Sequence, residues 1–430
     1  MKRLLAFIFP TFLWAQSYPE VISRVERSLT LQSAQQLEKA ALESYRAAEG
    51  KNLPVLDASL SAIKFQETPT VTFGSTKLPM GTKNHTEGSL TLTYPLFSGF
   101  AITSSIEKAK LSHEKAALEV SDLKRNLFVN ATRLYSAVAA TNAIIAAQEE
   151  AKNAIGESYA KAKGLYDNGM LAPAELYAIE AKKFEIEAQI TESQNRKSQA
   201  LNQLSHLTGE KIESAQLPAN ALPITEENEM IAIALTQRED LLALAKAMDI
   251  AQSDIKIAQS RYYPNVALVG SLKGQGDTLA LDGDGYTNAN KSYAGIFASW
   301  NLFSGFSDVH TAEAAKAVRL ASSITLEDYK HRIATEIDNG YLDINATQSK
   351  LESARMQVKA SGEYAKLTRG RFENQLAGAD ELSRAIADFA SAKSKVATLE
   401  SDLFNQSATL WLNGGLETYQ EKVLGMSQKQ

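Results

Sequence analysis

The pentapeptide LFSGF occurs at residues 96–100 and again, letter for letter, at residues 302–306, an offset of 206 (302 − 96). Each copy follows a short segment of alternating apolar and polar residues and precedes a long segment rich in Ala, Leu, Glu and Lys. Alternation indicates a half-exposed strand, and the following pattern indicates a helix. Gly99 and Gly305 therefore lie where an extended chain bends into a helix, a junction that favours a residue without Cβ.

The same offset joins other positions along the chain. It pairs Tyr135 with Tyr341, Asn168 with Asn374, Glu175 with Glu381, and Leu176 with Leu382. Similarity at a fixed period is the signature of an internal duplication. We therefore expect two fused copies of one unit, with a first repeat, a linker, a second repeat and a tail over residues 16–209, 210–228, 229–415 and 416–430.

The composition excludes several classes of protein. The 430 residues carry a formal net charge of −5 and include no cysteine. Without a basic excess there is no electrostatic reason to expect nucleic-acid binding. Without cysteine the chain cannot form disulfides, zinc–thiolate sites, a cysteine nucleophile or an acylated N-terminal cysteine.

The N-terminus has the pattern of a secretory signal. Lys2 and Arg3 precede an apolar segment over residues 4–14, and Ala15 offers a cleavage site before Gln16. We expect residues 1–15 to be a signal peptide; the alternative is an apolar first helix of the mature fold. No later apolar run is long enough to cross a bilayer as a helix, so a membrane crossing would use strands.

The first repeat is predicted to contain a helix, a strand, a polar loop and a return strand, over residues 18–51, 53–65, 66–88 and 89–96. Pro54 ends the helix, because proline cannot donate a backbone hydrogen bond. On the return strand, alternation places Leu90, Leu92 and Tyr94 on one face and the intervening polar residues on the other.

The second repeat follows the same order. Residues 230–260 are predicted to be helical, a strand begins near residue 266, and residues 274–291 form a loop rich in Gly, Asp and Asn. The return strand is predicted to continue to residue 302. Its face equivalent to that of Leu90 carries Ile296, Ala298 and Trp300.

The longest predicted elements are the proline-free helices that follow each pentapeptide, over residues 98–163 and 304–371. At a rise of 1.5 Å per residue, each would be on the order of 100 Å long. Apolar residues recur in steps of four and three, which predicts coiled-coil-like packing. Antiparallel partner helices are expected over residues 173–207 and 380–412.

A short tip joins each long helix to its partner. The first tip, residues 166–175, contains an Asn-Gly turn signal and Pro173 in the first turn of the next helix. The second tip, residues 372–381, keeps the length but moves the glycine. We expect these tip residues to lack packing partners within their own hairpin: Gly169, Met170, Leu171, Leu376 and Ala377.

The chain shows no catalytic signature. Its histidines are scattered without metal-ligand spacing, so neither an enzyme, a cofactor nor a metal site is expected. The Asp-Gly-Asp-Gly sequence at residues 282–285 suggests calcium, but the remaining ligands of an EF-hand loop are absent. We interpret it as a hydrophilic loop.

Aromatic residues gather at the strand–helix junctions: Tyr94, Phe97, Phe100, Tyr262, Tyr263, Trp300, Phe303 and Phe306. In a soluble protein they would form a core cluster. In a membrane protein, amphipathic rings settle at the boundary between water and lipid. The signal segment and the alternating strands favour the second interpretation.

This order of elements resembles the TolC family of outer-membrane efflux and secretion ducts. The most specific parts are PLFSG at residues 95–99, NLFSG at 301–305 and YDNGMLAPAEL at 166–176. The resemblance implies a mainly α-helical fold with a membrane β-barrel. In such a homotrimeric duct, each subunit gives four strands to one barrel and its long helices to a periplasmic tunnel.

The resemblance also implies a passive duct in the bacterial outer membrane, which receives drugs, small molecules or secreted protein from an inner-membrane pump through a periplasmic adaptor. Together with the residue pattern, it leads us to expect four kinds of site. Adaptor contacts lie at the tips: Asn168, Gly169, Met170, Leu171, Asn374, Leu376 and Ala377. Strand residues face outer-membrane lipid: Leu90, Leu92, Tyr94, Ile296, Ala298 and Trp300. Strand-to-helix junctions contain Phe97, Ser98, Gly99, Phe303, Ser304 and Gly305.

An entrance gate is the remaining implied site. Members of the family often carry an acidic pair just after the second tip, and here a charged cluster flanks that tip: Arg369, Arg371, Asp380, Glu381 and Arg384. Arg384 stands where a second acid would be expected. We interpret the arginines as groups that bridge the acids across subunits and hold the entrance closed.

Two other classes of protein share parts of this pattern. A periplasmic adaptor also has a helical hairpin, but it needs β-rich lipoyl-like halves at the base, which this sequence does not show. A coiled-coil envelope structural protein would have no use for the paired strands. The duct is therefore the favoured hypothesis.

Overall fold

The computed structural model describes residues 16–218, 222–283 and 291–425. The predicted signal peptide, residues 1–15, lies outside the described residues, as do residues 284 and 285 of the Asp-Gly-Asp-Gly sequence. The chain forms two compact units. Of the described residues, one unit contains 16–35, 118–218, 222–242 and 328–425, and the other contains 36–117, 243–283 and 291–327. Each unit therefore takes segments from both repeats.

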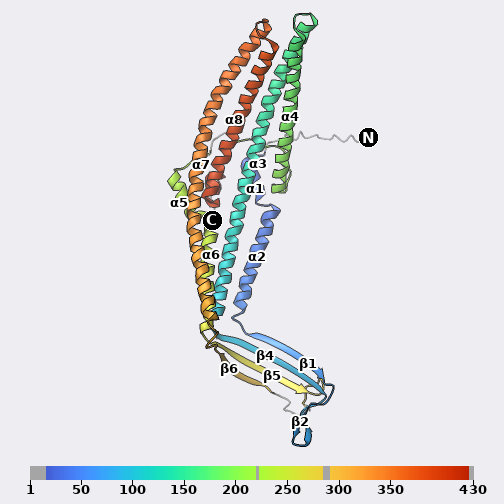
Figure 1. Cartoon of the computed structure of the whole chain (residues 1–430), viewed down its shortest axis with the longest axis vertical. Helices are drawn as coiled ribbons and strands as arrows, with labels where there is room; N and C mark the ends of the chain where they lie inside the picture. Colours follow the sequence, from blue (N-terminus) through green and yellow to red (C-terminus); the bar gives the residue numbers. More distant parts are fainter. Residues whose placement is uncertain (1–15, 219–221, 284–290, 426–430) are drawn as a thin grey trace, which may run out of the picture. The chain divides into compact units, whose positions relative to one another are not determined.

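The two repeats have closely similar element orders (Figure 1). The elements of the first are α1 (Tyr18–Val25), α2 (Leu29–Gly50), β1 (Val55–Lys64), β2 (Thr70–Phe73), β3 (Thr76–Pro79), β4 (Asn84–Ser98), α3 (Ala101–Asp167) and α4 (Pro173–Thr208). Those of the second are α5 (Glu227–Gln237), α6 (Glu239–Gln259), a 3₁₀ turn (Ser260–Tyr262), β5 (Asn265–Gly276), β6 (Tyr293–Ser299), α7 (Ser307–Glu373), α8 (Ala379–Gly414) and α9 (Leu416–Lys422).

The long helices confirm the prediction most directly, since α3 and α7 each contain 67 residues. Each is followed by a 36-residue partner helix, α4 or α8. In the part of the chain that the structure describes, no helix combines the length and the apolar character needed to cross a membrane.

Two predicted helices are each divided in the structure. The helix expected over residues 18–51 is α1 and α2, separated by a turn in which the buried Ser28 accepts a hydrogen bond from the Leu31 backbone N–H (3.3 Å). The helix expected over residues 230–260 is interrupted at Arg238, whose backbone is extended (φ −66°, ψ 122°). Helical periodicity continues through both breaks, so the pattern does not reveal them.

The loop expected over residues 66–88 is also more ordered than predicted. It contains the antiparallel hairpin of β2 and β3, with Gly74 in the left-handed region (φ 61°) at the turn, and β4 begins at Asn84. Similarly, β5 continues to Gly276, so Gly274 is a strand residue. A Cβ on Gly274 would lie 3.4 Å from the Leu281 side chain, at van der Waals contact.

The four longer strands form one antiparallel sheet in the order β1-β4-β5-β6, and Figure 1 shows them side by side. Its register places Leu92 opposite Leu56 and Gly270. Directly opposite residues share a face. The following residues therefore lie on one largely apolar face: Leu56, Ala58, Leu60, Leu90, Leu92, Tyr94, Leu268, Leu272, Ile296 and Ala298. The other face carries Asp57, Ser59, Thr91, Thr93, Ser271 and Lys273.

Trp300 departs from the prediction. The structure ends β6 at Ser299, so Trp300 follows the strand, and its indole N–H donates to the Tyr262 carbonyl oxygen (3.2 Å). The strand continuation expected to residue 302 is not formed.

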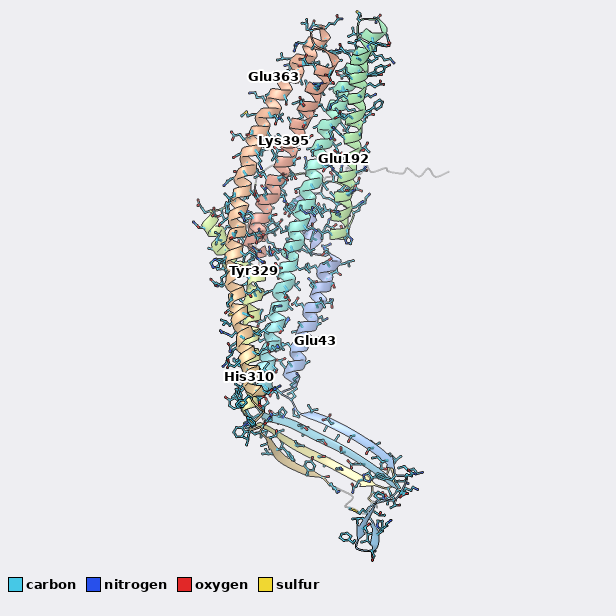
Figure 2. The ribbon with its side chains drawn as sticks, in the orientation of Figure 1. Glu43, Glu192, His310, Tyr329, Glu363 and Lys395 are labelled. Atoms are coloured by element: carbon cyan, nitrogen blue, oxygen red, sulfur yellow. The ribbon has the colours of Figure 1, made fainter. Side chains whose placement is uncertain are left out.

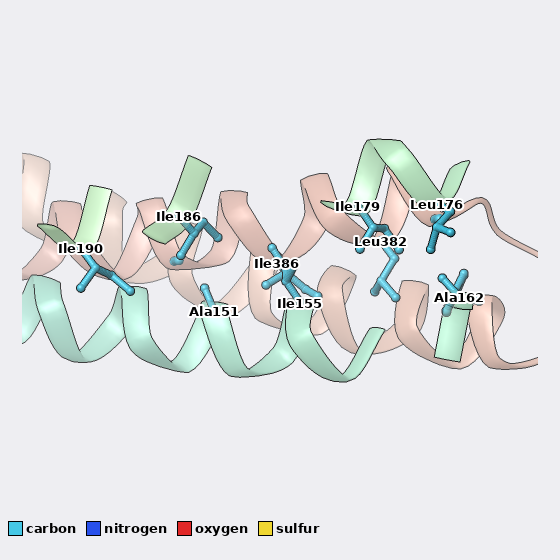
Figure 3. Close-up of a cluster of buried hydrophobic side chains, with 12 residues drawn as sticks. Ala151, Ile155, Ala162, Leu176, Ile179, Ile186, Ile190, Leu382 and Ile386 are labelled. Carbon is cyan, nitrogen blue, oxygen red and sulfur yellow. The ribbon is translucent and has the colours of Figure 1, made fainter. Parts of the chain in front are cut away.

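A core of buried apolar side chains lies between α3, α4, α7 and α8 (Figure 3). Ile155 and Ile179 are completely buried in it, and Leu382 is nearly so. Complete burial of such a side chain contributes about 1.5–3 kcal/mol. This core holds the two helical hairpins against each other near their tips.

Candidate functional site: strand-to-helix junctions and helical tips

At the first junction, Ser98 caps the long helix that follows. Its hydroxyl oxygen accepts a hydrogen bond from the Ile102 backbone N–H (3.2 Å). Gly99 and Phe100 then have left-handed backbones, with φ of 60° and 70°. A side-chain oxygen at this position satisfies one of the free N–H groups of the helix start.

The second junction repeats this geometry. Ser304 accepts from the Asp308 backbone N–H (3.3 Å), and Gly305 and Phe306 both have φ of 65°. A left-handed residue other than glycine costs about 1–2 kcal/mol. Phe100 and Phe306 adopt this conformation directly after a left-handed glycine. The pentapeptide therefore contains two consecutive left-handed residues in each repeat.

The first phenylalanine of each pentapeptide packs edge-on against the last. The ring centroids of Phe97 and Phe100 are 5.3 Å apart at an interplanar angle of 87°, and those of Phe303 and Phe306 are 5.5 Å apart at 87°. Such pairs contribute about 0.5–1.5 kcal/mol beyond area burial. This contact offsets part of the backbone strain and explains why the phenylalanines recur with the serine and glycine.

The tips also share one hydrogen-bond pattern. In the first, the Gly169 N–H donates to the Tyr166 carbonyl oxygen (2.9 Å) and the Met170 N–H donates to that of Leu165 (2.8 Å), the two bonds of a Schellman motif. In addition, the Asn168 side-chain amide donates to the Gly164 carbonyl oxygen (2.7 Å).

In the second tip, the equivalent bonds run from Gln375 to Phe372 (3.0 Å) and from Leu376 to Arg371 (2.7 Å). The Asn374 side chain donates to the Gly370 carbonyl oxygen (2.8 Å), as Asn168 does in the first tip. Gln375 occupies the left-handed position (φ 62°) that Gly169 (φ 72°) fills in the first tip. The displaced glycine precedes α8 instead, at position 378.

Packing divides the predicted tip residues into two groups. Met170 and Leu376 are 58% and 70% exposed, which agrees with the expectation that they lack packing partners. Leu171 and Ala377 instead pack against the core between the hairpins. The expectation was wrong for these two, because the turn directs them back toward the helices.

Each predicted gate arginine has an acidic partner within its own chain. Arg371 pairs with Glu381 (2.7 Å), Arg384 pairs with Asp380 (2.7 Å), and Arg369 lies 3.9 Å from Glu157. These charges are between one third and three quarters exposed, and exposed pairs contribute only about 0–1 kcal/mol each. In the hypothesis that the arginines bridge the acids between subunits, each such bridge would therefore have to replace an ion pair that is already formed within one chain.

Sequence reasoning missed the polar contacts that join the two hairpins. Lys161 of α3 pairs with Glu373 of α7 (2.5 Å), and this hydrogen bond lowers the pKa of Glu373. Glu175 of α4 accepts a hydrogen bond from the Ala379 backbone N–H at the start of α8 (3.3 Å). Glu175 and Glu381 are equivalent in the duplication, yet only Glu175 reaches the other hairpin.

A buried charge network surrounds the break between α5 and α6, and it was also missed. Asp240 accepts hydrogen bonds from Arg238 (3.0 Å), Arg125 (3.1 Å) and the Tyr329 hydroxyl (2.6 Å). Figure 2 labels Tyr329 on α7. Arg238 also donates to Glu336 (2.8 Å). Arg125 and Arg238 are 4% and 5% exposed, so the extended backbone at Arg238 brings distant segments into one satisfied network.

Glu239, next to this network, is unusually placed for a carboxylate. It is 7% exposed and accepts a hydrogen bond from the Leu416 backbone N–H (2.8 Å). Burial raises its pKa above the ordinary value of 4.5. Among the described residues, no three His, Asp or Glu side chains are grouped so that they could hold a metal ion.

Solved structures show which class of protein has this fold. VceC, an outer membrane protein from Vibrio cholerae, is 18% identical with a TM-score of 0.80, over 93% of this chain and 96% of that one. The outer-membrane channel OprN is 19% identical with a TM-score of 0.79, over 93% and 89%. The CmeC outer membrane channel of Campylobacter jejuni is 14% identical with a TM-score of 0.78, over 92% and 85%. The fold is therefore that of TolC-like outer-membrane channels.

The family follows from the sequence itself. The model of the outer membrane efflux protein family matches residues 23–210 and again residues 230–412, so the chain belongs to this family. It is a family of channels, not of enzymes. A comparison with curated proteins finds no match.

Proposed function

We propose that this protein is the outer-membrane exit duct of a tripartite efflux system. In this role a homotrimer passively conducts drugs or other small molecules, delivered by an inner-membrane pump and a periplasmic adaptor. The alternative cargo for the same architecture is a protein that a type I secretion system exports. The observation that carries the proposal is the family match in both repeats.

The sheet supports an assembly of several copies in lipid. In the described chain β1 and β6 each have one hydrogen-bonded neighbour, so both edges of the sheet are open. Open edges are not tolerated in the hydrocarbon region of a membrane, because nothing there satisfies the backbone groups. Three copies that pool their strands would remove all edges.

The two faces of the sheet suggest which one meets lipid. Leu90, Leu92 and Ile296 project from the largely apolar face and are 40%, 41% and 68% exposed in the single chain. The opposite face is rich in hydroxyl and charged side chains. We assign the apolar face to outer-membrane lipid, with the junction aromatics, Trp300 among them, at the periplasmic boundary.

The tips are the proposed adaptor contact. Met170 and Leu376 are large apolar side chains exposed at equivalent ends of the two hairpins. The symmetric turns that present them would offer an adaptor two similar surfaces per subunit, six per trimer. The pairs Arg371–Glu381 and Arg384–Asp380 lie beside the second surface. An adaptor that competes for these charges would loosen the entrance.

Deletion of the gene tests the proposal. Cells that keep the pump and the adaptor but lack this chain should accumulate a fluorescent pump substrate and become more susceptible to drugs. Expression of the intact chain should restore efflux. Unchanged accumulation with every candidate substrate, together with a monomeric purified protein, would favour the adaptor or the coiled-coil structural protein instead.

A further inference from the structure

The short hairpin of β2 and β3 is amphipathic. The two strands form a sheet of their own, separate from the four-stranded sheet. The directly opposite pair Val71–Leu78 lies on the same face as Phe73, and the pair Thr72–Lys77 lies on the other. One face of the hairpin is therefore mainly apolar and the other is polar.

The apolar face of the hairpin is uncovered in the single chain. Phe73 and Leu78 are 69% and 47% exposed, and Met80, directly after β3, is 62% exposed. Single apolar residues on a surface are normal, but a group of them marks an interaction site. A two-stranded hairpin is also only marginally stable in water. The hairpin therefore needs a surface that covers its apolar face.

The position of the hairpin places it next to the proposed lipid-facing surface. It joins the end of β1 to the start of β4, and Figure 1 shows β2 beyond the ends of these strands. At its base, the Phe65 N–H donates to the Lys83 carbonyl oxygen (2.8 Å), and the Met80 N–H donates to that of Pro69 (2.8 Å). Because β1 follows α2 and β4 leads into α3, the hairpin lies at the strand ends remote from the helices. In the proposed duct, these are the ends that reach the outer leaflet of the membrane.

The segment that contains the hairpin is basic. Residues 64–84 contain three lysines, Lys64, Lys77 and Lys83, and one acid, Glu67, which gives a formal charge of +2 (3 − 1), whereas the whole chain carries −5. All three lysines are exposed. Alternation along β1 puts Lys64 on the same face as Leu60, the face assigned to lipid. Lysines at a membrane surface extend their ammonium groups toward anionic lipid headgroups.

The hairpin is too small to bind a protein partner stably by itself. Each strand has four residues, whereas a stable protein–protein interface takes about 20–30 residues on each side. A small apolar surface with lysines around it is instead typical of an element that lies in the interface of an anionic membrane. A lipid surface with phosphate groups therefore fits both the size and the charge of the hairpin.

We propose that the hairpin of β2 and β3 docks on the phosphate-bearing lipids of the outer leaflet. Its apolar side chains enter the upper part of the acyl-chain region, and the three lysines bind the lipid phosphates. This inference rests on the proposed lipid-facing side of the four-stranded sheet and goes beyond it. The hairpin adds a lipid contact outside that sheet and fixes the depth of the strands in the membrane.

Site-directed fluorescence tests the proposal, because the natural chain contains no cysteine. The variant Phe73→Cys is labelled with the small apolar fluorophore bimane, and the full-length protein is reconstituted in vesicles of phosphatidylethanolamine and lipopolysaccharide. A lipid that carries a nitroxide on its acyl chain should quench the label at position 73. Leu78→Cys, on the same face of the hairpin, should behave in the same way and protects against a defect of one variant.

The matched control is Thr72→Cys, the neighbouring position on the polar face of the hairpin. Acrylamide dissolved in the water should quench the label at position 72 several-fold more strongly than the label at position 73. The nitroxide lipid should have the opposite order of effect. Equal quenching of the two positions by each quencher would overturn the proposed orientation of the hairpin.

The lysines are tested by combining Lys64→Gln, Lys77→Gln and Lys83→Gln with the label at position 73. Replacement of lipopolysaccharide by neutral phosphatidylcholine should lower nitroxide quenching when the lysines are present, because the attraction to phosphate is lost. The triple variant should give the same quenching in both kinds of vesicle. A difference between the vesicles that persists in the triple variant would overturn the binding of phosphate by these lysines.

Leu92→Cys, on the apolar face of the four-stranded sheet, is the reference for lipid contact and should be quenched by the nitroxide lipid. If it is quenched while position 73 is open to acrylamide, the hairpin stands in water and the inference is overturned, but the proposed function is not. Protection of position 73 from acrylamide without nitroxide quenching would mean that protein covers the apolar face, which also overturns the inference. A label at position 92 without lipid contact would contradict the proposed function itself.

Discussion

Substitution of Gly99 by alanine tests the account of the junction, because two separate costs can be read from the structure. The left-handed backbone (φ 60°) penalises any residue with a Cβ by about 1–2 kcal/mol. In addition, the new methyl group would lie 2.3 Å from the Ser260 carbonyl oxygen, which is backbone and cannot rotate away. Overpacking of this kind costs about 1–3 kcal/mol. The total expected loss is therefore about 2–5 kcal/mol.

Gly169→Ala is the matched control, since it has a similar backbone angle (φ 72°) but no described heavy atom within 4 Å of the new Cβ. It should lose only the backbone contribution, about 1–2 kcal/mol. Thermal unfolding of the purified protein in mild detergent, followed by circular dichroism at one scan rate, compares the two variants. Equal losses would refute the claim that the Ser260–Tyr263 turn is seated on Gly99.

Three further predictions follow from the sheet, the tips and the buried carboxylate. Leu92→Arg should prevent membrane assembly, at a cost of about 2–4 kcal/mol near the bilayer midplane, whereas Thr91→Arg on the opposite face should assemble; the reverse result in outer-membrane fractions would invert the faces. Met170→Glu with Leu376→Glu should abolish efflux in a susceptibility assay but leave trimers intact, with Lys395→Glu, a charge change on α8 away from the tip, as the control; normal efflux by the double variant would exclude the tips as the adaptor contact. The raised pKa of Glu239 means that the folded state holds the proton of this carboxyl more tightly than the unfolded state. The contribution of Glu239 to stability is therefore full below the ordinary pKa of 4.5 and is lost as pH rises through the pKa of the folded state. Glu239→Gln should flatten that part of the stability–pH curve, and an unchanged slope would contradict the raised pKa.

The duplication made much of the fold predictable. Serine and glycine recur at both junctions because each is required by the local backbone. Ser98 and Ser304 cap helices, and Gly99 and Gly305 adopt left-handed backbones. Backbone requirements that are met by residues only a few positions apart can be recognised from the sequence. The tips were predictable for the same reason, since Asn168 and Asn374 make the same hydrogen bond.

Features that depend on distant residues were missed. The break at Arg238 is stabilised by Glu336, 98 residues away, and the local pattern remains helical across it. Leu171 packs on a core to which the distant helices α7 and α8 contribute, Leu382 and Ile386 among their residues. In the gate cluster the charged residues were identified, but their partners were not. The acid 3.9 Å from Arg369 is Glu157, on a helix of the other repeat.

Conductance across a planar lipid bilayer tests the central claim most directly. Purified trimers, added to one side, should produce discrete, long-lived steps of current, as expected of a water-filled duct. The variant with Arg369 and Arg384 both changed to Gln should give larger current steps if these charges narrow the entrance. A change in step size between the parent and this variant also verifies that the current passes through this protein. Trimers that insert into the bilayer but produce no steps, in the parent or in this variant, would contradict the account.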